Sequence, residues 1–149
     1  MAEPAVGGTG GVEAANRSFY TAIESGDIDL MTALWLPGED TACVHPGNEV
    51  VRGTPAILRS WSLVMASTPY IQFFLTDVAM SAHGDVALVG CTENILAAGE
   101  GAPAAELTGG RAVALNTFVR TGAGWRMWAH HASPVLGRGN EPAGPGEET

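Results

Sequence analysis

The chain contains no lysine, and all seven of its basic residues are arginine. Lysine supplies the amine of Schiff-base nucleophiles, the anchor for pyridoxal phosphate and the phosphate-binding side chain of Walker motifs. The sequence therefore excludes these three kinds of site. Basic charge is also scarce, since 16 acidic residues give the 149-residue chain a formal net charge of -9. This charge repels phosphate backbones and anionic lipids, which argues against nucleic-acid binding and electrostatic attachment to a membrane.

Cysteine is scarce too, because only Cys43 and Cys91 are present and neither belongs to a CxxC pair. A zinc ribbon and a disulfide scaffold are therefore excluded. Both cysteines lie in apolar runs, which predicts buried free thiols in a reducing cytoplasm. No run approaches about 18 apolar residues, and the N-terminus lacks a signal-peptide pattern, so no membrane span or secretion is predicted. The Ala- and Gly-rich, arginine-only composition is compatible with a high-GC bacterial genome.

The length and the 46% hydrophobic content predict one globular domain. Residues 1–11 and 135–149 are rich in Gly and Pro and are predicted to be flexible tails around a domain at residues 12–134. A third such stretch, 97–110, lies between two apolar runs and is predicted to be a long loop.

Apolar periodicity predicts a run of helices followed by a meander of strands. The expected helices are Val12–Ser25, Asp27–Leu36 and Pro55–Ser67, the last capped by Thr54. The expected strands are Thr41–His45 and Val50–Arg52 in a small hairpin, then Ile71–Met80, Asp85–Leu96, Arg111–Arg120 and Gly124–Ser133. This order favours an α+β fold with helices on one face of a curved antiparallel sheet, which can leave a pocket between the two layers.

Four segments carry a resemblance to a known family. They are Ser25-Gly26-Asp27-Ile28, Val44-His45-Pro46-Gly47, the stretch from Arg52 to Ile57, and the last strand from Trp125 to Ser133. Together they resemble the SnoaL-like, or nuclear transport factor 2-like, superfamily. The resemblance implies a cone in which a strongly curved antiparallel sheet wraps around three helices. That superfamily includes a steroid isomerase, polyketide cyclases, an epoxide hydrolase, a dehydratase and non-enzymatic transport and kinase-association domains, so the fold does not select a function.

The resemblance also suggests positions for a site. By similarity to the steroid isomerase, the general-base position falls on His45 and the oxyanion tyrosine falls near Phe19, with the neighbouring Tyr20 expected to face another way. The last strand is similar to that of the kinase-association domain, whose pocket arginines match Glu93 and Asn116 here.

Strand alternation gives an independent prediction for the last hairpin. With Thr121–Gly124 as its turn, Asn116 and Phe118 share a face with Met127 and His131. Asn116 and His131 are then diagonal neighbours on an otherwise apolar face, as is typical of a small-molecule pocket.

The preceding strand adds Cys91 and Glu93 to the same face. The hairpin register brings Glu93 near Asn116. An error of one residue in this face assignment would instead leave Thr92 and Asn94 inside.

His131, Glu93 and His45 are the candidate catalytic residues. Imidazole can exchange a proton near neutral pH, so His131 is the first candidate for acid–base chemistry. Glu93 could orient it, or act as a base in an apolar pocket, while Asn116 could hold a carbonyl or hydroxyl oxygen. The alternatives are that His131 forms a structural hydrogen bond in the core or at a dimer seam, and that His45 closes its turn. The spacing does not favour a metal site on these residues, and no cofactor is predicted.

The aromatic residues suggest pocket walls and a partner surface. Phe19, Trp35 and Trp61 on the helices could roof the pocket or pack in the core. Trp128 and His130 are expected on the opposite face of the sheet. An apolar outer face predicts burial against a second copy of the chain, and the resemblance implies the same back-to-back pairing.

The residues leave two functional hypotheses. No GxSxG motif is present, and phosphoryl transfer lacks both lysine and an acidic metal cluster. We predict a small, cytoplasmic, cofactor-free enzyme that acts on a largely apolar small molecule by acid–base chemistry: isomerisation, cyclisation, dehydration or epoxide opening. The alternative is a non-catalytic ligand-binding or assembly module of the same fold.

Overall fold

The computed structural model describes residues 10–98 and 108–136. The elements follow the predicted order of two helices, a hairpin, a third helix and four long strands. They are α1 (Gly10–Ser25), α2 (Ile28–Leu34), β1 (Ala42–Val44), β2 (Val50–Arg52), α3 (Thr54–Ser67), β3 (Tyr70–His83), β4 (Val86–Ala98), β5 (Thr108–Thr121) and β6 (Gly124–Pro134). None of these described helices is long and apolar enough to cross a bilayer.

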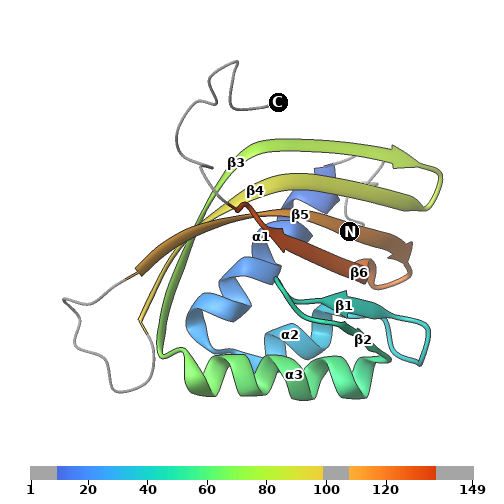
Figure 1. The fold of residues 1–149 in the computed structure, drawn as a ribbon. Coiled ribbons are helices and arrows are strands. Elements are labelled where there is room, and N and C mark those ends of the chain that lie inside the picture. Colours follow the sequence, from blue (N-terminus) through green and yellow to red (C-terminus); the bar gives the residue numbers. More distant parts are fainter. Residues whose placement is uncertain (1–9, 99–107, 137–149) are drawn as a thin grey trace.

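The six strands form one curved sheet in the order β2-β1-β6-β5-β4-β3. Figure 1 shows this sheet bending over α1, α2 and α3, which all lie on its concave side. This arrangement confirms the α+β cone predicted from the sequence. Every pairing is antiparallel except that of β1 with β6, which run parallel, so the sheet is mixed rather than purely antiparallel.

Local chemistry explains where the first two helices begin and end. Apolar residues recur at helical spacing along α1, and Val12, Phe19 and Ile23 are buried against the sheet. Gly26 ends α1 with a φ of 65°, a left-handed conformation that favours glycine. Asp27 then caps α2, because its carboxylate accepts a hydrogen bond from the backbone nitrogen of Leu30 at 3.0 Å.

The start of α3 differs from the prediction. Gly53, with a φ of 87°, occupies the cap position, and Thr54 is the first helical residue. The Thr54 hydroxyl bonds instead to the Thr41 hydroxyl at 2.8 Å and to the backbone oxygen of Leu36. This side chain therefore ties α3 to the segment between α2 and β1, rather than capping its own helix.

The boundaries of the predicted tails and loop are only partly described. Helix α1 begins at Gly10, β4 continues to Ala98 and β5 begins at Thr108, so these elements extend beyond their predicted limits. Residues 1–9, 99–107 and 137–149 lie outside the described part of the chain. The predicted flexible tails and the predicted long loop fall mainly there and remain predictions.

An irregularity in the last hairpin decides which side chains face the helices. Phe118 pairs with Met127, but the preceding residue of β5, Thr117, pairs with Ala129. Trp128 is thus an extra residue in β6, a β-bulge. Its indole nitrogen donates to the backbone oxygen of Asp40 at 3.2 Å, outside the core.

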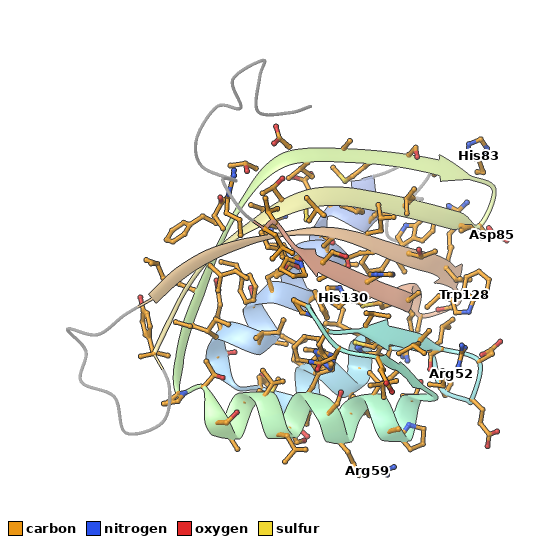
Figure 2. The ribbon with its side chains drawn as sticks, viewed as in Figure 1. Arg52, Arg59, His83, Asp85, Trp128 and His130 are labelled. Atoms are coloured by element: carbon orange, nitrogen blue, oxygen red, sulfur yellow. The ribbon has the colours of Figure 1, made fainter. Side chains whose placement is uncertain are left out.

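The bulge reverses the alternation of β6, so His130 points inward and His131 points outward. His130 is buried, whereas His131 is exposed on the convex face of the sheet. The sequence-based face assignment of these two histidines is therefore wrong, because it assumed uninterrupted alternation along the strand. In Figure 2, His130 lies between the sheet and the helices, and Trp128 lies farther along toward the turn end of β6.

Candidate functional site

A cluster of polar side chains is buried between α1 and the concave face of the sheet. Its members are Asn16 and Tyr20 on α1, Glu93 on β4, Asn116 on β5 and His130 on β6, each at most 4% exposed. Asn16 and Tyr20 lie four residues apart and therefore on the same side of the helix. Their position on α1 brings them against the inner faces of β4, β5 and β6.

Hydrogen bonds connect these five side chains in one network. The Tyr20 hydroxyl donates to Glu93 Oε2 at 2.6 Å. The Asn116 amide nitrogen donates to the Tyr20 hydroxyl at 3.2 Å and to Asn16 Oδ1 at 2.8 Å. The Asn116 oxygen lies 2.6 Å from His130 Nδ1. A carboxyl group and an imidazole are thus held at opposite ends of a Tyr–Asn bridge.

Burial shifts the pKa values of the two end groups in opposite directions. It raises the pKa of the Glu93 carboxyl to about 6, although the hydrogen bond from Tyr20 partly opposes the shift. It lowers the pKa of His130 to about 3, with smaller contributions from the charges of His45 and His131. At neutral pH, Glu93 is therefore mainly a carboxylate and His130 is a neutral imidazole. Burial also raises the pKa of Tyr20, so its hydroxyl keeps its proton.

Aromatic rings pack around the imidazole. The centroids of Phe19 and Trp61 lie 4.8 and 5.9 Å from that of His130. The ring of His45 packs on the same indole at 4.6 Å, so the two histidines share Trp61 as a neighbour. These contacts give His130 a largely apolar environment, consistent with its lowered pKa.

His45 forms a separate polar contact with Ser60. His45 Nε2 lies 2.9 Å from the Ser60 hydroxyl, which also lies 2.7 Å from the backbone oxygen of Ile57. Because a carbonyl oxygen can only accept, the Ser60 proton is directed to Ile57 and the serine accepts from His45. In this arrangement Ser60 is not activated as a nucleophile, since that would require it to give its proton to the imidazole.

The structure brings several predicted site residues together. Glu93 and Asn116 both face inward, which confirms the face assigned to them. The predicted pocket-lining side chains are also buried in this core, and they are Phe19, Trp35, Trp61, Cys91, Phe118 and Met127. Cys43 and Cys91 are free and buried, as predicted. His45 is half-buried beside Trp61.

His131, the first candidate for catalysis, does not join this cluster. It lines a groove of about 380 Å³ on the convex face, together with Asp77, Val113, Leu115 and Ser133. His45, Glu93 and His131 are therefore not gathered at one point. Within residues 10–98 and 108–136, no three His, Cys, Asp or Glu side chains lie close enough together to hold a metal ion.

Sequence reasoning missed Asn16, Tyr20 and His130. The expectation that Tyr20 faces another way is wrong, because its ring packs inside against Phe19 and Phe73. The signal for the two helical residues was present, since Asn16 and Tyr20 continue the helical spacing of the buried Val12. His130 had no comparable signal, because its orientation depends on the bulge at Trp128.

Fold and site together define a cone-fold protein with a buried network of polar side chains. Residues 12–137 match the model of the SnoaL-like domain, and the chain belongs to this family. No curated protein matches the chain.

Solved structures show the same architecture. A protein from Streptomyces avermitilis, proposed to be a dehydratase of the NTF2-like family, is 48% identical, with a TM-score of 0.79 over 85% of this chain and 95% of that chain. A proposed association domain of calcium/calmodulin-dependent protein kinase type II from Thiobacillus denitrificans is 29% identical, with a TM-score of 0.71 over 83% and 94%. A proposed scytalone dehydratase from Novosphingobium aromaticivorans, at 11% identity and a TM-score of 0.73 over 85% and 83%, shares the fold.

Proposed function

We propose that this protein is a cofactor-free enzyme that performs acid–base chemistry, of the dehydratase or isomerase type, on a largely apolar small molecule. The observation that carries the proposal is the buried pair of Glu93 and His130, whose pKa values burial moves in opposite directions. Titratable groups with separated pKa values in an apolar environment are typical of acid–base sites. The sequence predicted the imidazole role for His131, and we propose His130 in its place, because the bulge turns the His130 side chain inward.

Dehydration and isomerisation both require one group to take a proton and another to deliver one. Between pH values of about 3 and 6, His130 is neutral and Glu93 is protonated, so a base and an acid coexist. In a dehydration, His130 takes a proton from carbon, and Glu93 gives its proton to the hydroxyl that leaves as water. The carbon–oxygen bond breaks as the carbon–carbon double bond forms. Exchange with solvent returns both groups to their initial states.

The surroundings support an apolar substrate. Phe19 and Trp61 are buried beside the polar cluster, as in ligand sites that combine apolar walls with few polar groups. The neighbour proposed to be a dehydratase, at 48% identity, supports this reaction type.

The test begins with a thermal-shift screen of apolar hydroxy and carbonyl compounds. Compounds that raise the melting temperature are incubated with the protein and examined by mass spectrometry and NMR. His130→Gln and Glu93→Gln are each expected to abolish conversion and leave the fold intact. His131→Gln is the matched control, since it changes a histidine one residue away but on the convex face. Full conversion by both core variants would refute the assignment.

A non-catalytic binding or assembly module is the second candidate. It is favoured by the saturation of the Asn116 amide, since both its nitrogen and its oxygen are hydrogen-bonded within the protein. The similarity to a proposed kinase association domain also supports it. In this case stabilising ligands are recovered unchanged, and substitutions at His130 and Glu93 alter only affinity.

We also propose that two copies of the chain pair through the convex face of the sheet. Val113 and Leu115 are 49% and 53% exposed there, and Leu88 and Trp128 extend the apolar surface. Leu115→Glu should convert a dimer to a monomer in sedimentation velocity. Leu63→Glu is the control, because Leu63 is 70% exposed on α3, away from this face. A wild-type chain that sediments as a monomer would refute the pairing.

Two further predictions from the composition remain proposals. The buried, unpaired thiols of Cys43 and Cys91 support a cytoplasmic location. The bacterial sources of the similar structures support a bacterial origin.

A further inference from the structure

The side-chain amide of Asn116 can adopt two orientations that exchange its nitrogen and oxygen, and its neighbours decide between them. The hydrogen-bond polarity of the network originates at Glu93. An ionised carboxylate can only accept, so the Tyr20 hydroxyl must direct its single proton to Glu93 Oε2, at 2.6 Å. The Tyr20 oxygen can then only accept on its other side. The Asn116 group that faces it, at 3.2 Å, is therefore the amide nitrogen.

Asn16 reinforces this orientation. Its Oδ1 accepts the second proton of the Asn116 nitrogen at 2.8 Å. Asn16 is itself an amide and could rotate together with Asn116, so it cannot set the orientation alone. The Tyr20 hydroxyl can set the orientation, because it donates its proton to Glu93, which is mainly an ionised acceptor at neutral pH.

The orientation of Asn116 determines the state of the imidazole. With its nitrogen toward Tyr20, the amide presents its oxygen to His130 Nδ1 at 2.6 Å. An oxygen acceptor requires a proton on Nδ1, so the lone pair of the neutral ring lies on Nε2. The reversed amide would present its nitrogen to Nδ1 and place the ring proton on Nε2 instead. In the first orientation Nε2 carries the lone pair and can act as a base. In the reversed orientation Nε2 carries the proton and can act only as a donor.

We infer that Tyr20 is a positioning residue whose hydroxyl, through Asn116, holds the His130 proton on Nδ1 and the lone pair on Nε2. The inference concerns the pH range above about 6, where Glu93 is ionised, and it rests on the proposed function only in that this lone pair serves as the base. The tautomer itself does not depend on turnover.

The test is a measurement of the His130 tautomer by ¹⁵N NMR of the imidazole nitrogens in the full-length protein. Protonated and lone-pair ring nitrogens have widely separated chemical shifts, so the populations of the two tautomers can be read directly. Spectra are recorded above the pKa of Glu93, about 6, where that carboxylate is ionised. The wild-type protein should show the Nδ1 proton predominantly.

Tyr20→Phe removes the hydroxyl and keeps the ring, so Asn116 loses the acceptor that distinguishes its two orientations. The ratio of the Nε2-protonated to the Nδ1-protonated tautomer should rise about ten-fold, which corresponds to about 1.4 kcal/mol, the scale of one hydrogen bond. Cys91→Ala is the matched control. It removes a sulfur 3.6 Å from the Tyr20 oxygen but leaves the hydroxyl in place, so the tautomer should not change.

A wild-type His130 protonated on Nε2 would overturn the inference, and this result needs no variant. An unchanged tautomer ratio in folded Tyr20→Phe would also overturn it, as would an equal change in Cys91→Ala. If the tautomer behaves as expected but no ligand is converted, the proposed function fails and the inference stands. Conversion of a ligand with the opposite tautomer would overturn only the inference.

Discussion

The buried imidazole of His130 should make the folded protein sensitive to acid. Its pKa is about 3 in the folded state, against an ordinary value of 6.5. The folded state therefore binds fewer protons at this site than the unfolded state between those two pH values. Stability from this group is fully present above pH 6.5 and is lost as the pH falls toward about 3.

The magnitude follows from the difference between the two pKa values. A difference of about 3.5 units, at about 1.36 kcal/mol per unit, gives a loss of about 5 kcal/mol across that pH range. Glu93 acts in the opposite direction, because its raised pKa means that acid restores about 2 kcal/mol as the pH falls from about 6 to 4.5. The net loss, about 3 kcal/mol, is large for a domain whose total stability is about 5–15 kcal/mol.

The assay is urea unfolding followed by tryptophan fluorescence at a series of pH values. His130→Gln retains an N–H group for Asn116 but cannot become charged, so its free energy of unfolding should fall by about 5 kcal/mol less than that of the wild-type protein over this range. His131→Gln is the control and should stay close to the wild-type curve, because the charge of His131 contributes least to the lowered pKa of His130. His45, whose pKa is also lowered by burial, is present in all three proteins. Parallel curves for wild type and His130→Gln would refute the reasoning.

Other predictions address the carboxyl group, the core and a helix cap. If the protein is an enzyme, kcat/KM should be highest between the pKa values of His130 and Glu93, about 3 and about 6, and should fall as Glu93 ionises. A value of kcat/KM that rises above pH 6 would assign Glu93 a different role. Glu93→Gln should remove the stability that the wild-type protein loses through Glu93 ionisation as the pH rises from 4.5 to about 6. The variant should therefore be about 2 kcal/mol more stable at neutral pH in urea unfolding, and no gain in stability would contradict this prediction. Phe118→Ala removes a fully buried ring and should cost about 3–5 kcal/mol in the same assay, whereas a cost below about 1 kcal/mol would contradict its place in the core. Asp27→Ala removes the α2 cap and should cost about 1 kcal/mol in thermal or urea unfolding, while Asp29→Ala, in the same helical turn but not at the cap, should cost less.

The elements of this fold could be predicted because their signals are local. Helical spacing in α1, Gly26 and Asp27 between the first helices, and the His83-Gly84 turn each act over a few residues. Alternation also placed Glu93 and Asn116 on the concave face correctly, since no irregularity interrupts the β4–β5 pairing between them. The sequence by itself therefore determined the order of the elements, the fold class and two members of the polar cluster.

The remaining members of the cluster were decided by tertiary structure. The bulge at Trp128 depends on how β6 pairs with β5 on one side and with β1 on the other, and no local pattern in residues 125–133 specifies it. That one extra residue places His130, rather than His131, in the site. Tyr20 became part of the site only when α1 docked against β4 and β5, because helical spacing gives a buried face but not the side chains that meet it. Local periodicity shows which residues face a core, and only the packing of distant strands shows which of them touch.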